Sequence, residues 1–496
     1  MEHGAWAWRI LPAAGENSLQ WLFASLVAWR ILPAAGENSL QRLFASLVAW
    51  SMEGRSLRCL EFSPTTRKSY FCPMKAQLPP QIQPITQLSL PEYESSSLSN
   101  GMPLYTLIGG SEPVMKLELV FRAGSWYETK PGVAEFMAAL LSEGTQKLTS
   151  AELAEHIESR GATLQTRGGV DTVRIRLYTL TRFLPDLIEV MTDVMNIPLF
   201  DQNELKVYSE NKVERLMIDL KKNEVLAYRY LTESMFGPGH PYGRNVKPEN
   251  YLDIQTTDLR QHHDHHIHPA KGMLFVSGSF GAKEIDLIHH TIGQWNPRHL
   301  NGQQPGPKPL AISKTGMHEV DGPQTHQAAI RIGNKLFPQH HEDYPGMFVL
   351  NTILGGYFGS RLMTEIRENQ GMTYGIYSSV DTFAEDGCFY ISTETATDNT
   401  QKVIDGIKAE IHKLQTELIP SEELQMARNY IMGHLMTQLD GAFSSMDFIK
   451  SMKIEHLDSE HFGKVINVVQ QITPEELQAL AKKYFVMDDW IIIVVK

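Results

Sequence analysis

From about Leu90 onward, the apolar and polar positions of the chain follow patterns typical of strands and helices. Residues 114–128 read VMKLELVFRAGSWYE, with partial alternation of apolar and polar side chains, and residues 171–180, DTVRIRLYTL, alternate more regularly. A period of two is typical of a strand with one buried face, so each segment predicts a strand. Residues 97–108, SLSNGMPLYTLI, predict a hairpin that turns at Asn100–Gly101, a dipeptide that favours tight turns.

Helices are predicted between these strands. Thr149 and Glu152 have the spacing of a capping box, and Gly161 supplies a stop signal, so residues 150–160 are expected to form a helix. The stretch GVAEFMAALLSEGT, residues 132–145, is an apolar run between glycines and predicts a second helix. The first half of the body therefore mixes strands and helices.

The order of these elements repeats in the second half of the chain. LFDQNEL at 199–205 matches LIPSEEL at 418–424, an offset of 418 − 199 = 219. DTVRIRLYTL from Asp171 matches DGCFYISTETA from Asp386, an offset of 386 − 171 = 215. Residues 256–278 match residues 473–495 in the same order. Because order and spacing repeat together, we predict an α+β fold made of two homologous α/β sandwich domains. These domains are expected at 74–300 and 310–496, joined by the Pro- and Gly-rich link GQQPGPKP at 302–309.

The N-terminal segment 1–73 differs from the rest of the chain. Residues 7–27 and 28–48 are copies of one 21-residue sequence that differ only at Trp21 and Arg42. Two nearly identical copies are too few to build a repeat fold, so residues 1–73 are predicted to be a non-globular extension. The sequence leaves open whether the natural protein starts at Met1 or Met74. The apolar run in the extension is too short to cross a bilayer, and no membrane span is expected.

The charge and cysteine content narrow the range of partners and compartments. The chain has 57 acidic and 45 basic residues among 496, a net charge of −12, which argues against nucleic acid as the main partner. Three cysteines without a C-x-x-C pair cannot build a disulfide framework, so a reducing, cytoplasmic location is expected. Export stays open because the extension could conceal a signal peptide.

The predicted helix at 132–145 has the frame of a metal-binding helix without the ligands. In H-x-x-E-H, two imidazoles four residues apart lie on one helix face and bind zinc, and the Glu between them acts as a base. At this point the chain resembles the insulinase or pitrilysin-type zinc peptidases, which include the mitochondrial processing peptidases. Glu135 stands at the first His, Ala138 at the Glu and Ala139 at the second His of that motif.

The resemblance also implies a third zinc ligand, a Glu, on a later helix. The matching segment reads VYSENKVERLM, residues 207–217. Glu210 and Glu214 lie nearby, but the expected position of the ligand falls near Leu216. No metal is therefore expected in this chain.

The second half retains the other part of the family's site. Active members pair an Arg with a Tyr seven residues later, and the two residues hold the substrate. The stretch LGGYFGSRLMTEIRENQGMTYGIYS, residues 354–378, carries Arg367 and Tyr374 at that spacing. A guanidinium and a phenol can donate hydrogen bonds to a peptide carbonyl or to an oxyanion. The resemblance thus implies substrate binding by this pair.

Some members of this family divide the site between two chains, and this sequence resembles the chain without zinc. The resemblance implies a non-catalytic subunit, inactive alone, that forms half of a chamber around unfolded peptide. An H-x-x-E-H partner would hold the zinc. Three alternatives remain: a structural subunit like the core proteins of respiratory complexes, a peptide-binding homodimer, and a metallohydrolase that uses the histidines of HHDHHIHP, residues 262–269.

Overall fold

The first half of the body forms a six-stranded sheet. The computed structural model describes residue 85 and residues 87–296, 314–324 and 326–496, so the predicted extension 1–73 and the link 302–309 lie outside the described residues. The strands are β1 (Glu94–Ser97), β2 (Pro103–Ile108), β3 (Val114–Phe121), β4 (Thr163–Gly168), β5 (Val173–Leu180) and β6 (Gly272–Gly278), in the order β1-β2-β6-β3-β5-β4. β2 and β6 are parallel, and all other neighbours are antiparallel.

Local sequence signals position the elements of this half. Gly101 turns the β1–β2 hairpin at φ 84°, and the predicted capping box of Thr149 and Glu152 forms. The helices are α3 (Val133–Leu140), α4 (Ser150–Glu158), α5 (Leu184–Asn196), α6 (Gln202–Asp219), α7 (Asn223–Phe236), α8 (Pro248–Leu252), α9 (Thr256–His266) and α10 (Ala282–His290). α3 and α5 pack against the sheet at β4 and β5, and α9 lies against α3. The apolar residues of β3 and β5 form one core with these helices.

The second half repeats the topology of the first. Its strands are β7 (Gly316–Val320), β8 (Gln327–Leu336), β9 (Thr373–Thr382), β10 (Gly387–Ala396) and β11 (Ile491–Val495), in the order β7-β11-β8-β10-β9. Its helices are α11 (Tyr344–Asn351), α12 (Thr400–Thr416), α13 (Ser421–Gln438), α14 (Ala442–Ile454), α15 (Ser459–Gln471) and α16 (Pro474–Tyr484), with π-helical turns η4 (Thr352–Gly356) and η5 (Met363–Asn369). β7 and β11 are parallel like β2 and β6, and the remaining pairs are antiparallel. The predicted mixed fold with two related sheets is confirmed.

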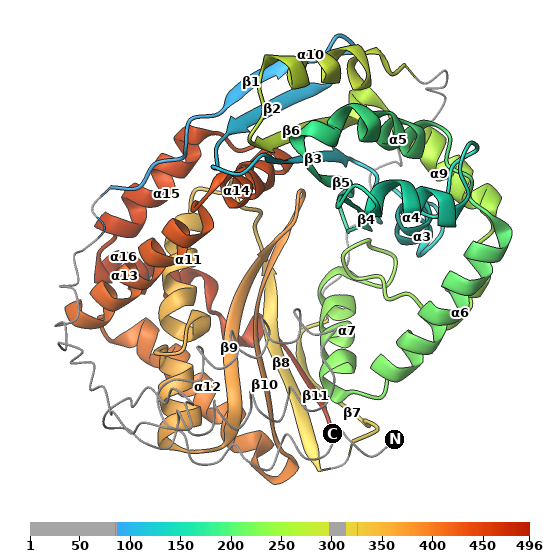
Figure 1. The fold of residues 1–496 in the computed structure, drawn as a ribbon. Coiled ribbons are helices and arrows are strands. Elements are labelled where there is room, and N and C mark those ends of the chain that lie inside the picture. The colour runs from blue at the N-terminus through green and yellow to red at the C-terminus, as the bar shows by residue number, and fades with distance from the viewer. Residues whose placement is uncertain (1–84, 86, 297–313, 325) are drawn as a thin grey trace, which may run out of the picture. The chain divides into compact units, whose positions relative to one another are not determined.

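Each sheet is covered on its other face by a helix from the opposite half (Figure 1). α7, from the first half, packs on β8 and β11, and its apolar face joins Ile491, Ile493 and Cys388 in one core. α14, from the second half, packs on β2 and β6, where Met446 and Ile449 meet a small apolar cluster. The starting positions of the two helices differ by 442 − 223 = 219, which is the offset between the repeated segments LFDQNEL and LIPSEEL. The halves therefore exchange equivalent helices.

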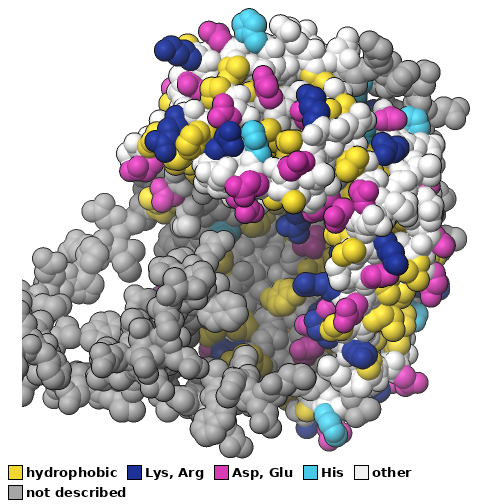
Figure 2. Space-filling view, turned by 45° about the vertical axis from the view of Figure 1, so that its right-hand side comes forward, with side chains coloured by type: hydrophobic (Ala, Val, Ile, Leu, Met, Phe, Trp, Pro, Cys, Tyr) yellow, Lys and Arg dark blue, Asp and Glu magenta, His cyan; other side chains and the backbone are white. Residues whose placement is uncertain are grey.

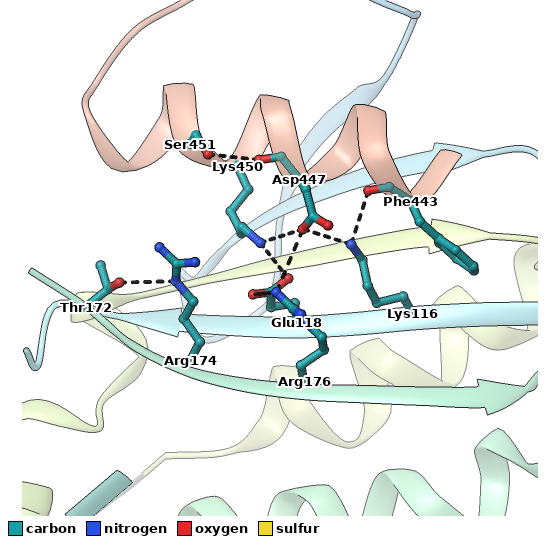
Figure 3. Close-up of polar contacts among 9 residues, drawn as sticks. All are labelled: Lys116, Glu118, Thr172, Arg174, Arg176, Phe443, Asp447, Lys450 and Ser451. Atoms are coloured by element: carbon teal, nitrogen blue, oxygen red, sulfur yellow. Dashed lines mark hydrogen bonds and ion pairs between the residues drawn. The ribbon is translucent and has the colours of Figure 1, made fainter. Parts of the chain in front are cut away.

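A buried group of charges joins α14 to the first sheet (Figure 3). Lys450 donates to Glu118 on β3 at 2.8 Å, and Arg176 on β5 donates to the other oxygen of Glu118 at 3.0 Å. Asp447 accepts from Lys450 at 2.5 Å and pairs with Lys116 at 2.9 Å. Glu118 is 0% exposed and Lys116 1% exposed, so this cluster is an integral part of the contact. A buried carboxylate is stable only when its charge is paired, as here.

Two features of the described residues bear on membrane and nucleic-acid binding. Among the described residues, no helix is both long and apolar enough to cross a membrane. Figure 2 shows hydrophobic, basic and acidic side chains intermixed on the described part of the face that it presents. That face does not carry a continuous Lys and Arg surface of the kind that binds nucleic acid.

Candidate functional site

The helix that carries the motif positions, α3, begins at a specialised turn. Gly132 precedes it with φ 91°, a left-handed conformation that glycine adopts without strain. The buried carboxylate of Glu128 accepts from the backbone N–H groups of Gly132 at 3.1 Å and Ala134 at 3.0 Å, and Arg244 pairs with the same carboxylate. A carboxylate at a helix N-terminus satisfies otherwise unpaired donors. The local sequence therefore fixes where α3 starts and which face it presents.

The motif positions of α3 hold an ion pair. Glu135 and Ala139 are partly exposed on one side of the helix, whereas Ala138 is buried in the core. The ammonium of Lys212, on α6, pairs with the Glu135 carboxylate, and the Tyr251 hydroxyl donates to it at 3.2 Å. Burial together with the Glu135 charge raises the pKa of Tyr251, so this phenol stays a hydrogen-bond donor. The cation that connects α3 to α6 is thus a lysine side chain.

α6 offers no carboxylate to this face of α3. Glu210 and Glu214 are both exposed, and Leu216, at the position expected for the third ligand, packs against the first core. Lys212 and Leu216 are four residues apart and lie on the same side of α6. The donors present, one carboxylate already paired with an ammonium and two alanine side chains, do not fit a zinc ion, which requires several Cys, His or carboxylate ligands. Within the described ranges, no group of three His, Cys, Asp or Glu side chains could hold a metal ion.

The histidine-rich segment at the end of α9 has a structural role. The Nε2 atom of His262 lies 2.8 Å from the Ala123 carbonyl oxygen, and that of His263 lies 2.7 Å from the Met195 carbonyl oxygen. Burial lowers the pKa of His262 to about 4 and that of His266 to about 3, so these rings are neutral at physiological pH. His262 and His263 therefore contact backbone carbonyls, and the described part of this segment holds no group of three side chains that could bind a metal ion.

Arg367 and Tyr374 lie next to each other at the start of β9. Arg367, on η5, donates from Nε to the Tyr374 carbonyl oxygen at 3.0 Å, and its guanidinium lies 4.8 Å from the centre of the Phe358 ring. The Tyr374 side chain is 95% exposed, and Phe358 and Tyr377 are exposed as well. Exposed aromatic side chains beside a guanidinium can bind a peptide by stacking and hydrogen bonding. Direct contact between this pair and substrate stays a prediction.

Sequence reasoning missed Lys212 and Tyr251 as partners of Glu135. Lys212 lies in the segment 207–217, where the third ligand was sought, 77 residues after Glu135 (212 − 135). The family's pattern specifies an acid at the third ligand, so it does not indicate a lysine in this segment. The sequence signal for the ion pair is a Glu at the first ligand position together with a Lys on the helix expected to carry the third ligand.

Two family models match this chain, and known proteins resemble it in sequence. The family described as "Insulinase (Peptidase family M16)" matches residues 110–240, and "Peptidase M16 inactive domain" matches residues 253–431. A protein of Bacillus subtilis described as an uncharacterized zinc protease is 23% identical over 374 residues, covering 74% of this chain and 89% of that protein. A Helicobacter pylori protein described as a non-peptidase homolog is 21% identical over 384 residues, covering 76% and 88%.

Among solved structures, a peptidase M16 inactive domain from Pseudomonas fluorescens superposes with a TM-score of 0.74 at 20% identity. It covers 81% of this chain and 98% of that one.

Proposed function

Because the chain belongs to the insulinase (M16) family of peptidases as a member without the catalytic motif, we propose that it is the non-catalytic subunit of a heterodimeric zinc peptidase. A homologous partner with H-x-x-E-H would hold the zinc, and this chain would form half of a peptide-degrading chamber. Its own contribution would be to bind unfolded peptide and hold it for the partner. The Glu135–Lys212 ion pair at the motif positions carries this proposal.

That ion pair supports a stable, non-catalytic role for the first half. The Lys212 ammonium neutralises the Glu135 carboxylate, which would otherwise attract a metal ion, and the Tyr251 hydroxyl donates to the same carboxylate. α3 consequently keeps its contacts with α6 without a metal. A helix that had simply lost its ligands would leave polar groups unpaired, which proteins avoid.

Arg367 and Tyr374 support a substrate-binding role for the second half. The guanidinium orients the backbone of Tyr374, and the phenol extends almost wholly into solvent. Because the Tyr374 phenol is exposed to solvent, it contributes little to core packing. We therefore assign it a role in contacting a ligand. Hydrogen bonds from a phenol and a guanidinium to a peptide carbonyl would hold the chain being cleaved.

The test uses this chain alone and co-purified with an H-x-x-E-H homologue, with zinc content and cleavage of a quenched unfolded peptide as readouts. We expect the lone chain to be inactive and the pair to be active. Arg367→Ala and Tyr374→Phe in this chain should each lower kcat/KM of the pair by about 10-fold or more, as for removal of one positioning donor. Tyr430→Phe, at another exposed tyrosine, is the matched control and should have no effect.

Two results would favour the remaining alternatives. If the pair forms and both variants leave cleavage unchanged, the chain is a structural subunit. If the lone chain sediments as a dimer and binds peptide without cleaving it or needing a partner, it is a peptide-binding homodimer. Cleavage by the lone chain with bound zinc would overturn the proposal.

A further inference from the structure

One end of the first sheet presents three arginines on a single face. β4 is the edge strand and pairs with β5, and α14 covers the sheet at β2 and β6. Arg167 on β4 lies directly opposite Arg174 on β5, so their side chains are on the same face. Arg176, two residues further along β5, shares that face because side chains alternate along a strand. We name this surface the arginine face: Arg167, Arg174 and Arg176.

Within the described part of the chain, two of these three cations have no carboxylate partner. Arg167 is exposed, and among the described residues neither it nor Arg174 forms an ion pair. The Nε atom of Arg174 donates to the Thr172 hydroxyl, at 3.4 Å (Figure 3). Like charges directly opposite each other on a sheet destabilise it. In a chain with 12 more acidic than basic residues, an unpaired arginine pair at this position indicates a surface that meets a ligand.

The buried cluster beside the arginine face does not neutralise it. Three cations, Lys116, Arg176 and Lys450, face two carboxylates, Glu118 and Asp447, which leaves one positive charge in excess. Burial is the main reason that the pKa of Lys116 is lowered, so the protein holds this ammonium against a desolvation cost. Arg167 and Arg174 therefore carry the accessible positive charge, and the buried cluster beside them adds to it instead of cancelling it.

We infer that the arginine face binds extended peptides that carry carboxylates at alternate positions. Successive side chains on one face of a strand lie about 6.5–7 Å apart, and an extended peptide repeats its own side chains at that spacing. Arg174 therefore matches one carboxylate of a Glu-x-Glu segment, and Arg167 lies across from it. Arg176, which already donates to Glu118, adds positive charge beside the next carboxylate. A guanidinium binds a carboxylate through two parallel hydrogen bonds, which gives both affinity and orientation. The inference rests on the proposed function, because it takes the ligand to be a peptide.

The experiment measures binding of fluorescent peptides to the full chain by anisotropy at low salt. One peptide alternates Glu with Ser and Thr, and its matched partners have Gln or Lys in place of Glu. We expect the Glu peptide to bind at least about 10-fold more tightly than the Gln peptide, and Arg167→Gln and Arg174→Gln each to weaken it by about 3- to 10-fold. Arg215→Gln, at an exposed position of α6, removes the same charge and should leave binding unchanged.

A thermal measurement separates binding from folding. Because Arg167→Gln removes a like-charge contact with Arg174, the variant should melt at the same temperature as the unmodified chain or higher. Weaker binding by a variant that is no less stable is the expected combination.

Three outcomes would overturn the inference: equal binding of the Gln peptide, equal losses in Arg167→Gln and Arg215→Gln, or tighter binding of a single-stranded oligonucleotide of the same charge. These failures are distinct from a failure of the proposed function. If Arg367→Ala still lowers cleavage by the pair, only the arginine face loses its assigned ligand. If the Glu peptide binds through the arginine face and the Arg367 and Tyr374 variants change nothing, the proposed role of that pair is wrong and the arginine face stands.

Discussion

Replacing Lys450 by methionine tests whether the buried charges hold α14 on the first sheet. Lys450 is 2% exposed, and its ammonium contacts Glu118 at 2.8 Å and Asp447 at 2.5 Å. Methionine preserves much of the volume but leaves the fully buried Glu118 with Arg176 as its remaining cation. Removing one partner of a buried ion pair costs about 3–5 kcal/mol, and because Arg176 remains, we expect a loss near the lower end, about 3 kcal/mol.

Equilibrium unfolding in urea, followed by far-UV circular dichroism, measures this loss. Lys464→Met removes an exposed lysine that pairs with Glu460, and it should leave the unfolding curve unchanged. Glu118→Gln combined with Lys450→Met should cost less than the sum of the two single changes, by about 2 kcal/mol, because the two groups interact directly. Strict additivity, or a loss below about 1 kcal/mol in Lys450→Met, would show that apolar packing alone holds α14.

Three further predictions concern α3, α9 and the glycines. Lys212→Met and Glu135→Gln should each lower the free energy of unfolding by about 1 kcal/mol. The double change should lower it by little more than either single change, because both break the same partly exposed ion pair. Additive losses in urea unfolding would contradict a direct pair. Because burial lowers the pKa of His262 to about 4 and of His266 to about 3, the unfolded chain binds more protons below pH 6.5, so stability is complete above that pH and falls as the pH drops toward 4. Each ring should contribute about 2 kcal/mol of loss at about pH 5, and His266→Phe should flatten the measured pH profile. Gly355→Ala should destabilise the folded chain, because the added Cβ would lie 2.6 Å from the Ser378 backbone nitrogen. Gly433→Ala, in open space on α13, should stabilise the folded chain by about 0.5–1 kcal/mol. Equal melting temperatures of the two variants would refute this contrast.

Local signals in the sequence predicted the individual elements well. The capping box at Thr149, the turn at Gly101 and the repeat offset each depend on residues close together in the chain or on a simple comparison of its halves, and each appears as predicted. The alternation in VMKLELVF correctly divided β3 into two faces. Lys116 and Glu118 nevertheless lie on a buried face, because α14, a helix near the other end of the chain, covers it.

The same limit applies to the candidate site. The motif positions of α3 could be read from spacing, but the partner of Glu135 depends on the register of α6 against α3, which local patterns do not specify. The exchange of α7 and α14 is likewise invisible in the sequence, since an apolar helix face does not show which sheet it will cover.

The exchange of helices sets the order of events during synthesis. The last strand of the first sheet, β6, ends at Gly278, but α14, which covers that sheet, ends only at Ile454. At about 5–20 residues per second, the ribosome needs roughly 10–35 s to synthesise the chain from Gly278 to Ile454. During that time the apolar residues of β2 and β6 that α14 will cover remain exposed. The nascent first half is therefore exposed to aggregation and to chaperones throughout that interval. A chain that ends between these two points lacks the cover of its first sheet and part of the second core.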